Sequence, residues 1–288
     1  MMSLTPRAGR LVYVTALAVV VGVVAGASGG SVYNVVSEQM RTSGRQPSLL
    51  TDPLRVAVSE SPGFATVRPP DIAGFDIDVV NFLAAEAGVK PVYVGAAPSE
   101  RVSMLQSTAV QLASGVVITE GRRQFIDFAG PYIVSPNSLL TRAQEQSIST
   151  IDDLSGKRIC ALDATTATRE FEQLRAPVRT AASLAECVAH LREGEVDAVA
   201  GDLLALRAIM AEFPEADLQT SAFSFGESRY GIALPPGHAA DCERLTDSLQ
   251  QYIVSAEWEV SFQRHFGPQA DLAEFRPDPT RLTPCPSA

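Results

Sequence analysis

Charged residues are scarce in this sequence, and the basic ones do not form a stripe. The 288 residues include 23 Lys and Arg against 33 Asp and Glu, a formal net charge of −10 at pH 7. Because no basic surface could neutralise phosphates, the composition argues against a nucleic-acid-binding protein. Charged residues amount to 19% and hydrophobic residues to 46%, so the body of the chain is not intrinsically disordered. Its length suffices for one large or two mid-sized domains with buried cores.

Metal-ligating and catalytic motifs are also missing. The three histidines, His190, His238 and His265, are scattered, and no cysteine takes part in a Cys-x-x-Cys or Cys/His spacing. The sequence therefore predicts no metal and no cofactor. It has no phosphate-binding loop and no activated nucleophile, which argues against an enzyme.

Cysteines are few, but their number is even: Cys160, Cys187, Cys242 and Cys285. An even count is typical of an oxidising compartment and allows three pairings. Cys160 ends a strand-like segment and Cys187 lies in the next amphipathic helix, so we expect these two to pair. That pairing leaves Cys242 with Cys285. Free buried thiols are the alternative.

Charge is absent over a long run near the N-terminus. Arg7 and Arg10 precede residues 11–27, which carry no charge, and the next charged residue is Glu38. A basic start before such an apolar run indicates a cleaved secretory signal or a single membrane anchor with its basic side in the cytoplasm. The small residues at 25–27 suit cleavage, whereas the uncharged length suits anchoring. In both cases we expect the rest of the chain outside the cytoplasm.

After a signal anchor or signal peptide over residues 1–30 and a linker over 31–53, strand-like and helix-like segments alternate. Strands are predicted at residues 54–58, 90–95, 110–118, 158–162, 178–180, 194–202 and 230–234. Helices are predicted at residues 74–88, 99–107, 165–174, 183–193 and 239–266. This alternation predicts an α/β fold with sheets covered on both faces. Five prolines after Gly267 predict an extended, proline-rich tail over 268–288.

The most informative stretch is the apolar run 115–118, which ends in Thr119 three residues before Arg122. A helix that starts at Thr119 would bring the Arg122 guanidinium and free backbone N–H groups to one point. A small carboxylate needs such a set of donors. The alternative is an ordinary helix cap with a solvated arginine.

Residues 118–132 resemble the Ile-Thr-x-x-Arg…Phe-x-x-Pro-Tyr segment of bacterial extracellular solute-binding proteins of family 3, the amino-acid binders of ABC importers. Further motifs resemble the same family in the family's order. They are Gly-Phe-Asp-Ile-Asp at 74–78, Asp-Leu-Ser-Gly-Lys at 153–157, Gly-Glu-Val-Asp-Ala-Val at 194–199 and Tyr-Gly-Ile-Ala at 230–233. The resemblance covers about residues 54–267.

The resemblance implies a two-lobe α/β fold of periplasmic-binding-protein type II, with a hinge and a ligand cleft between the lobes. Lobe 1 would comprise residues 54–138 and 230–267, and lobe 2 residues 139–229. The implied ligand is a polar amino acid of the glutamate or glutamine kind, and the implied partners are the membrane subunits of an ABC permease. Relatives are often tethered by an acylated cysteine near the N-terminus. This chain has no cysteine before Cys160, so we favour an uncleaved anchor that keeps the binder near its permease.

The resemblance also implies roles for single residues. In the family, the arginine that matches Arg122 grips the α-carboxylate of the ligand, and the acid that matches Asp202 receives its ammonium group. A zwitterion loses hydration at both charges, so each needs a fixed opposite partner. A planar guanidinium suits a carboxylate better than lysine does. Thr119 and Thr165 would add donors, and Phe64 would cover the aliphatic part of the ligand.

Each of these residues has a plain structural alternative. Asp202 and Thr165 are also suited to capping helices, and Phe64 is also suited to a hydrophobic core. Asp76 and Asp78 are expected to cap the helix that they begin, and not to contact the ligand.

Gly115 and Val117 complete the implied ligand wall, and here the sequence departs from the family. A polar Thr or Ser is usual where Val117 stands, and Ala164 and Ala167 replace a glycine and a serine of the family's loop. Either the specificity has moved, or the protein is a membrane-tethered sensor or accessory protein with a divergent pocket. Cyclohexadienyl dehydratases share this fold, which makes an enzyme a third hypothesis that the absent catalytic motifs argue against.

Overall fold

A computed structural model describes residues 46–162, 171, 176–268 and 271–286. The predicted signal segment 1–30, Thr165 and most of the predicted helix 165–174 lie outside these residues. Within the described residues, no helix is both long enough and apolar enough to cross a bilayer. The end of the predicted linker packs on the body, because the Leu49 N–H donates to Asp241 Oδ2 at 2.7 Å.

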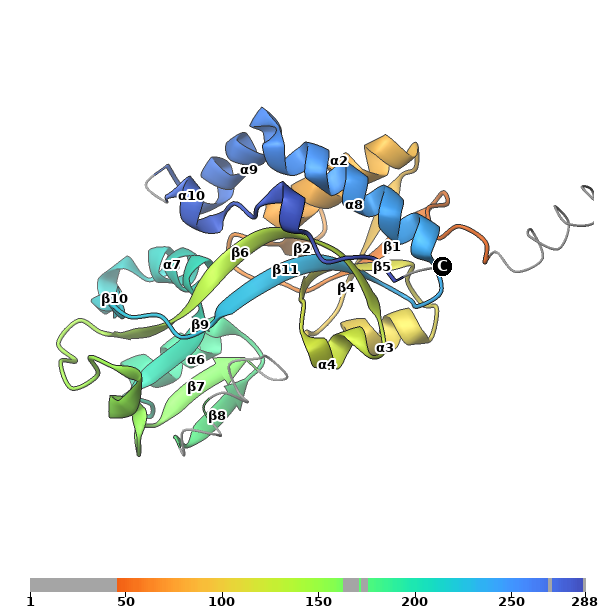
Figure 1. The fold of residues 1–288 in the computed structure, drawn as a ribbon. Helices are drawn as coiled ribbons and strands as arrows, with labels where there is room; N and C mark the ends of the chain where they lie inside the picture. The colour runs from red at the N-terminus through yellow and green to blue at the C-terminus, as the bar shows by residue number, and fades with distance from the viewer. Residues whose placement is uncertain (1–45, 163–170, 172–175, 269–270, 287–288) are drawn as a thin grey trace, which may run out of the picture. The chain divides into compact units, whose positions relative to one another are not determined.

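In the described residues, nine strands form one mixed sheet in the order β4-β1-β5-β11-β6-β9-β7-β8, with β10 paired to β6 (Figure 1). The first strand group consists of β1 (Leu54–Val58), β4 (Pro91–Gly95) and β5 (Leu112–Val117). The second strand group consists of β7 (Ile159–Leu162), β8 (Val178–Ala181) and β9 (Ala198–Asp202). Strands are parallel within each group. Parallel strands need crossover connections and are buried on both faces, as the apolar sequence of β1 requires.

Two long strands connect these groups, β6 (Asp127–Arg142) and β11 (Glu227–Leu234). The first half of β6 pairs with β11, and its second half pairs with β9 and with β10 (Leu218–Thr220), always antiparallel. β11 pairs in turn with β5. The chain thus passes from one strand group to the other along β6 and returns along β11, and Figure 1 shows the two strands side by side.

Helices accompany each strand group along the chain. The first group has α2 (Phe75–Ala87), α3 (Arg101–Gln106), α4 (Glu120–Arg123), α8 (Ala239–Val254) and α9 (Ala256–Phe266), and a hairpin of β2 (Thr66–Arg68) and β3 (Asp71–Ala73). The second has η1 (Ile151–Leu154), α6 (Leu184–Arg192), α7 (Leu203–Glu212) and η2 (Pro214–Ala216). The predicted C-cap at Gly88 is confirmed, since this glycine has φ 70° and its N–H donates to the Ala84 and Ala85 carbonyls. Glycine adopts this left-handed conformation without strain.

The sequence does not predict β6, because Gly130, Pro131 and Pro136 argue against a strand. In the structure Pro131 lies where the register between β6 and β11 shifts, between the pairs Ile133–Tyr230 and Ala129–Ile232. The missing N–H of this proline therefore falls at an irregularity of the ladder, where it is tolerated.

The single helix predicted over residues 239–266 is wrong, because the chain forms α8 and α9 with a break at Ser255. The Ser255 backbone is extended, with φ −77° and ψ 159°. Its hydroxyl oxygen accepts a hydrogen bond from the Trp258 N–H at 3.4 Å. A serine that caps a new helix offers the backbone an alternative to continuing the old one.

Both expected disulfides are present. Cys160–Cys187 joins β7 to α6, and Cys242–Cys285 joins α8 to the C-terminal residues. The free-thiol alternative is therefore wrong, and of the three possible pairings the structure contains the one that the sequence favours.

The C-terminal residues differ from the predicted extended tail. Residues 271–286, here called the C-terminal strap, contain α10 (Leu272–Phe275) and η3 (Pro279–Arg281). Phe275 is 0% exposed, and its ring stacks on that of Phe262 with the centroids 5.5 Å apart. The Arg276 guanidinium lies 4.5 Å from the ring centroid of Trp258. The strap is therefore part of the core beside α9.

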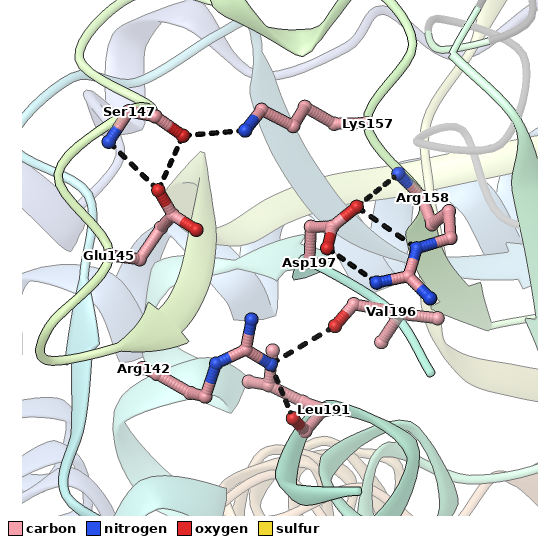
Figure 2. A network of polar contacts seen from close by, with 8 residues as sticks. All are labelled: Arg142, Glu145, Ser147, Lys157, Arg158, Leu191, Val196 and Asp197. Carbon is pink, nitrogen blue, oxygen red and sulfur yellow. Dashed lines mark hydrogen bonds and ion pairs between the residues drawn. The ribbon is translucent and has the colours of Figure 1, made fainter. Parts of the chain in front are cut away.

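Two of the sequence motifs meet in the second strand group. Asp197, from the Gly-Glu-Val-Asp-Ala-Val motif, accepts hydrogen bonds from the Arg158 backbone at 2.8 Å and from its guanidinium at 2.7 Å (Figure 2). Arg158 directly follows the Asp-Leu-Ser-Gly-Lys motif. Arg142, at the end of β6, donates to the carbonyls of Leu191 at 2.6 Å and Val196 at 3.2 Å. These contacts fasten α6 and β9 to β6 and β7, so the motifs have a structural role here.

Candidate functional site

A cavity with about 830 Å³ of empty space, part of it open to solvent, lies at the carboxyl ends of the parallel strands. Residues at or just after the ends of β1, β5, β7 and β9 line it, namely Ser59, Val117, Leu162 and Asp202. Ligands of α/β sheets bind at this edge. The connecting strands also contribute, through Asn137 of β6 and Tyr230 of β11. The cavity therefore lies between the two strand groups.

Most of the predicted ligand residues line this cavity: Phe64, Gly115, Val117, Arg122 and Asp202. Thr119 is not among the lining residues. Its hydroxyl oxygen accepts a hydrogen bond from the Arg122 N–H at 3.2 Å, so it caps α4. Thr165 lies outside the described residues.

Arg122 is oriented by the strand that precedes it. Its Nη1 donates to the carbonyl of Val117, the last residue of β5, at 2.8 Å. Thr119 has an extended backbone and starts α4 at this point. A guanidinium held by the protein loses less conformational freedom when a carboxylate binds.

Asp202 caps a helix, as its structural alternative predicts, and it also lines the cavity. Its Oδ1 accepts a hydrogen bond from the Ala205 N–H at 3.0 Å, which caps α7, and its Oδ2 accepts one from the Tyr230 hydroxyl at 2.8 Å. Burial raises the pKa of the Asp202 carboxyl, and these hydrogen bonds oppose the rise. Each carboxylate oxygen has two lone pairs, so both can accept a further bond from an ammonium group.

Phe64 is at once a core residue and part of the cavity lining. It is 3% exposed. Its ring centroid lies 4.9 Å from that of Tyr230 and 5.0 Å from that of Phe266. Phe64 and Tyr230 therefore form an aromatic wall beside Asp202.

Asp76 and Asp78 do not cap α2, contrary to the prediction. The N-cap is Gly74, which makes no side-chain capping bond. Asp78 Oδ2 instead accepts from the Ser261 hydroxyl at 2.7 Å and lies 3.0 Å from His265 Nε2, so Asp78 joins α2 to α9. Asp76 lines the cavity.

Asp76 is held in a buried network that the sequence does not reveal. It is 3% exposed, and its Oδ1 accepts a hydrogen bond from the Tyr132 hydroxyl at 2.6 Å. Tyr132 in turn accepts one from the Gly115 N–H at 2.8 Å. Burial raises the pKa of Asp76 to about 7, although the Tyr132 hydrogen bond and the charge of Arg101 oppose the rise. Arg101 is 8% exposed and donates from Nη1 to the Ser114 carbonyl at 2.7 Å.

Gly115 permits this close arrangement. Its φ is 66°, and a Cβ added here would lie 2.4 Å from Asp76 Oδ2 and 3.1 Å from Arg101 Nη1. An isolated glycine in an apolar strand is a sequence signal for a close approach. The signal does not identify the approaching groups, because Asp76 and Arg101 come from other elements.

Gly115→Ala is expected to lower the free energy of unfolding by about 1–3 kcal/mol, because alanine is strained at positive φ and its Cβ meets Asp76. Chemical denaturation measures this loss. Gly121→Ala is the matched control, since nothing lies within 4 Å of a Cβ added at Gly121 in α4. There the exchange should stabilise the helix by about 0.5–1 kcal/mol. Equal stabilities of the two variants would contradict this role of Gly115.

A group of potential metal ligands lies apart from the cavity lining. Atoms of His190, Glu193 and Glu195 lie within 4.8 Å of one another. The Arg179 guanidinium already pairs with Glu195 at 2.6 Å. Glu195 is thus already held in an ion pair with Arg179 of β8.

Comparison with known proteins identifies the family. Residues 54–268 match the bacterial extracellular solute-binding proteins, family 3. The glutamate-binding protein GluB of Corynebacterium glutamicum is 24% identical over 232 residues, which cover 75% of this chain and 78% of GluB. The ABC transporter glutamine-binding protein GlnH of Bacillus subtilis is 26% identical over 67% of this chain and 72% of GlnH.

Solved structures agree in fold. An ancestral arginine-binding protein bound to glutamine has a TM-score of 0.69 and 25% identity, over 74% of this chain and 97% of that one. The ancestral amino-acid-binding protein AncCDT-1, a precursor of cyclohexadienyl dehydratase, has a TM-score of 0.67 and 22% identity over 80% of this chain and 99% of its own. The two-lobe fold of periplasmic binding proteins is therefore confirmed. The family match spans most of the described residues, and the chain belongs to the bacterial extracellular solute-binding proteins of family 3.

Proposed function

We propose that this protein binds a polar amino acid in the cavity and delivers it to the membrane subunits of an ABC permease. One observation carries the proposal. Arg122 lies just after β5 of the first strand group, Asp202 is the last residue of β9 in the second strand group, and both line the same cavity. An α-amino acid carries a carboxylate and an ammonium group on one carbon atom. Each would meet a fixed group of opposite charge, which offsets the cost of removing both from water.

A ligand held in this way would draw the two strand groups together. We infer that lobe 1 comprises residues 54–138 and 230–267, that lobe 2 comprises 139–229, and that β6 and β11 form the hinge. Because the ligand would contact both lobes, it would favour the closed arrangement over the open one. A permease could then distinguish loaded from empty protein. The relatives GluB and GlnH are described as binding glutamate and glutamine, which supports a polar ligand.

We also infer an extracytoplasmic location and binding without chemical change. Two disulfides support the location, because such bonds persist in oxidising compartments. The charge-free run 11–27 would supply the signal or the anchor that this location needs. The relatives named above are binding proteins, so the ligand is expected to leave the cavity intact.

A thermal-shift screen of the full-length chain against the common amino acids tests the proposal. A ligand at about 100 times its Kd adds about 2.7 kcal/mol to the stability of the native state, which corresponds to a rise in Tm of about 5–10 °C for a protein of this size. The N-acetyl and methyl-ester forms of the active amino acid serve as controls. Each lacks one of the two charges and should give no shift. If no amino acid raises the Tm, the proposal is wrong.

A further inference from the structure

The proposed function leaves two buried charged residues of the cavity without a role, Asp76 and Arg101. They are 3% and 8% exposed, and both line the cavity. Burying a carboxylate and a guanidinium is costly unless each meets a polar partner. In the proposed function the carboxylate and ammonium group of the ligand contact Arg122 and Asp202, so they provide no ligand partner for Asp76 or Arg101.

Asp76 and Arg101 do not form a direct ion pair in the described part of the chain. Asp76 Oδ1 accepts a hydrogen bond from Tyr132 at 2.6 Å, and Arg101 Nη1 donates to the Ser114 carbonyl at 2.7 Å. Arg101 Nε is buried and has no hydrogen-bond partner among the described residues. A carboxylate accepts several hydrogen bonds and a guanidinium has five N–H donors. Both groups therefore keep hydrogen-bonding capacity for a ligand.

The acceptor Asp76 and the donor Arg101 lie next to each other beside Gly115. A Cβ added at Gly115 would meet Asp76 Oδ2 and Arg101 Nη1, at 2.4 Å and 3.1 Å. Because both groups also line the cavity, a ligand would meet an acceptor beside a donor. A carboxamide presents the complementary pair, a carbonyl oxygen that accepts and an NH₂ group that donates.

The charges of the cavity agree with an uncharged side chain. Its charged lining residues among those described are Glu60, Asp76, Arg101, Arg122 and Asp202. Glu60 is already paired with Arg68, whose Nη2 lies 2.7 Å from Glu60 Oε2. The carboxylate and ammonium of the ligand would neutralise Arg122 and Asp202. The remaining acid and base sum to zero, so a charged ligand side chain would leave one charge unpaired.

We propose that Asp76 and Arg101 form a side-chain subsite that selects a carboxamide, the side chain of glutamine or asparagine, over a carboxylate or a cation. This inference rests on the proposed function, because it places the side chain of the same ligand in the same cavity. A carboxylate side chain would bring a second negative charge to Asp76, and a cationic one would bring a second positive charge to Arg101.

The subsite makes the choice between glutamine and glutamate depend on pH. The pKa of Asp76 is about 7. Below this pH the neutral carboxyl group can donate a hydrogen bond to the side-chain carboxylate of glutamate. Above it, Asp76 must take up a proton before glutamate binds, so the glutamate affinity falls about tenfold per pH unit. Glutamine binding needs no proton.

The ionisable groups that interact with Asp76 are Arg101 on α3, Tyr132 on β6, Asp202 on β9 and Tyr230 on β11. Arg122 on α4 interacts with Arg101. On α2 itself, Asp78 is bonded to Arg264 and His265 of α9. Burial raises the pKa of both tyrosines well above their usual range, so they stay neutral. Asp202 would contact the ammonium group that glutamine and glutamate share. Its titration changes both affinities alike, and the ratio of the two affinities isolates Asp76.

Isothermal titration calorimetry of the full-length chain with glutamine, asparagine, glutamate and arginine tests the subsite. Between about pH 6 and about pH 9, the ratio of glutamine to glutamate affinity should rise about a hundredfold. In Asp76→Asn, which cannot ionise, the ratio should stay constant. Asp241→Asn is the matched control, because Asp241 is 4% exposed, accepts a bond from Ser48 at 2.7 Å and does not line the cavity. It should keep the pH dependence of the wild type.

The outcomes separate this inference from the proposed function. Two results would overturn the subsite and leave the proposed function standing. One is a ratio of glutamine to glutamate affinity that does not change with pH. The other is a preference for glutamate, arginine or an apolar amino acid at about pH 9. Absence of binding to every amino acid would overturn both. Should Asp76→Asn not fold, the pH profile of the wild-type ratio decides alone.

Discussion

Arg122→Ala is expected to weaken amino-acid binding at least about 30-fold. Removing one member of a buried, hydrogen-bonded charge pair costs about 2–5 kcal/mol, because the other charge is left without its partner. This corresponds to a rise in Kd of about 30-fold to several-thousand-fold, which calorimetry measures directly. Arg122→Lys should recover only part of the affinity. An ammonium keeps the charge, but it cannot contact both carboxylate oxygens in the planar geometry of a guanidinium.

Arg123→Ala is the matched control for this experiment. Arg123 is the next residue of α4, its side chain is 40% exposed and it lies 3.5 Å from Glu120 in an ion pair. It does not line the cavity. Exposed pairs contribute little, so this variant should bind like the wild type. Unchanged affinity in a folded Arg122→Ala protein would refute the role of Arg122 in holding the carboxylate.

The sequence predicts those parts of the candidate site whose contacts are local along the chain. Thr119 and Arg122 are three residues apart and share one helix cap. Asp202 ends a strand and starts a helix, so its position follows from two neighbouring signals. These contacts are short in sequence, and a pattern of residue types is enough to find them.

Asp76 shows where this approach fails. Its partners Tyr132 and Gly115 belong to β6 and β5, and only the folded sheet brings them to α2. A capping role is the reasonable local interpretation of an aspartate at a helix start. The structure overrides it because Gly74 begins the helix and the carboxylate turns to a buried hydroxyl. No rule about helix ends contains that information.

The fold shows the same division. Most strands of the two parallel groups are apolar runs bounded by turns, and the sequence locates the strands of both groups to within a few residues. The sequence does not reveal the helix break at Ser255, because the apolar spacing continues on both sides of it. The contact that starts the new helix is a single hydrogen bond from the Trp258 N–H to the Ser255 hydroxyl oxygen. The C-terminal strap is missed because prolines indicate only the absence of long helices. They say nothing about which surface the segment covers.

The C-terminal strap is expected to contribute strongly to stability through Phe275. Its side chain is 0% exposed and stacks on Phe262, which itself stacks on Trp258 with centroids 5.0 Å apart. Trp258 Nε1 donates to the Tyr132 carbonyl of β6 at 2.9 Å. The strap is thus linked through α9 to β6, the strand that connects the two strand groups. The disulfide Cys242–Cys285 fixes its far end to α8.

Phe275→Ala is therefore expected to lower the free energy of unfolding by about 3–5 kcal/mol, the cost of removing a buried phenylalanine and leaving a cavity. Chemical denaturation with the disulfides intact measures it. Phe125→Ala is the matched control, because Phe125 is 60% exposed and its loss should change the stability by less than about 0.5 kcal/mol. Equal, small losses in both variants would mean that the strap is an appendage. A large loss confined to Phe275 would mean that the residues after α9 complete the core around α9. Truncating the chain after α9 would then remove part of the scaffold that positions the cavity.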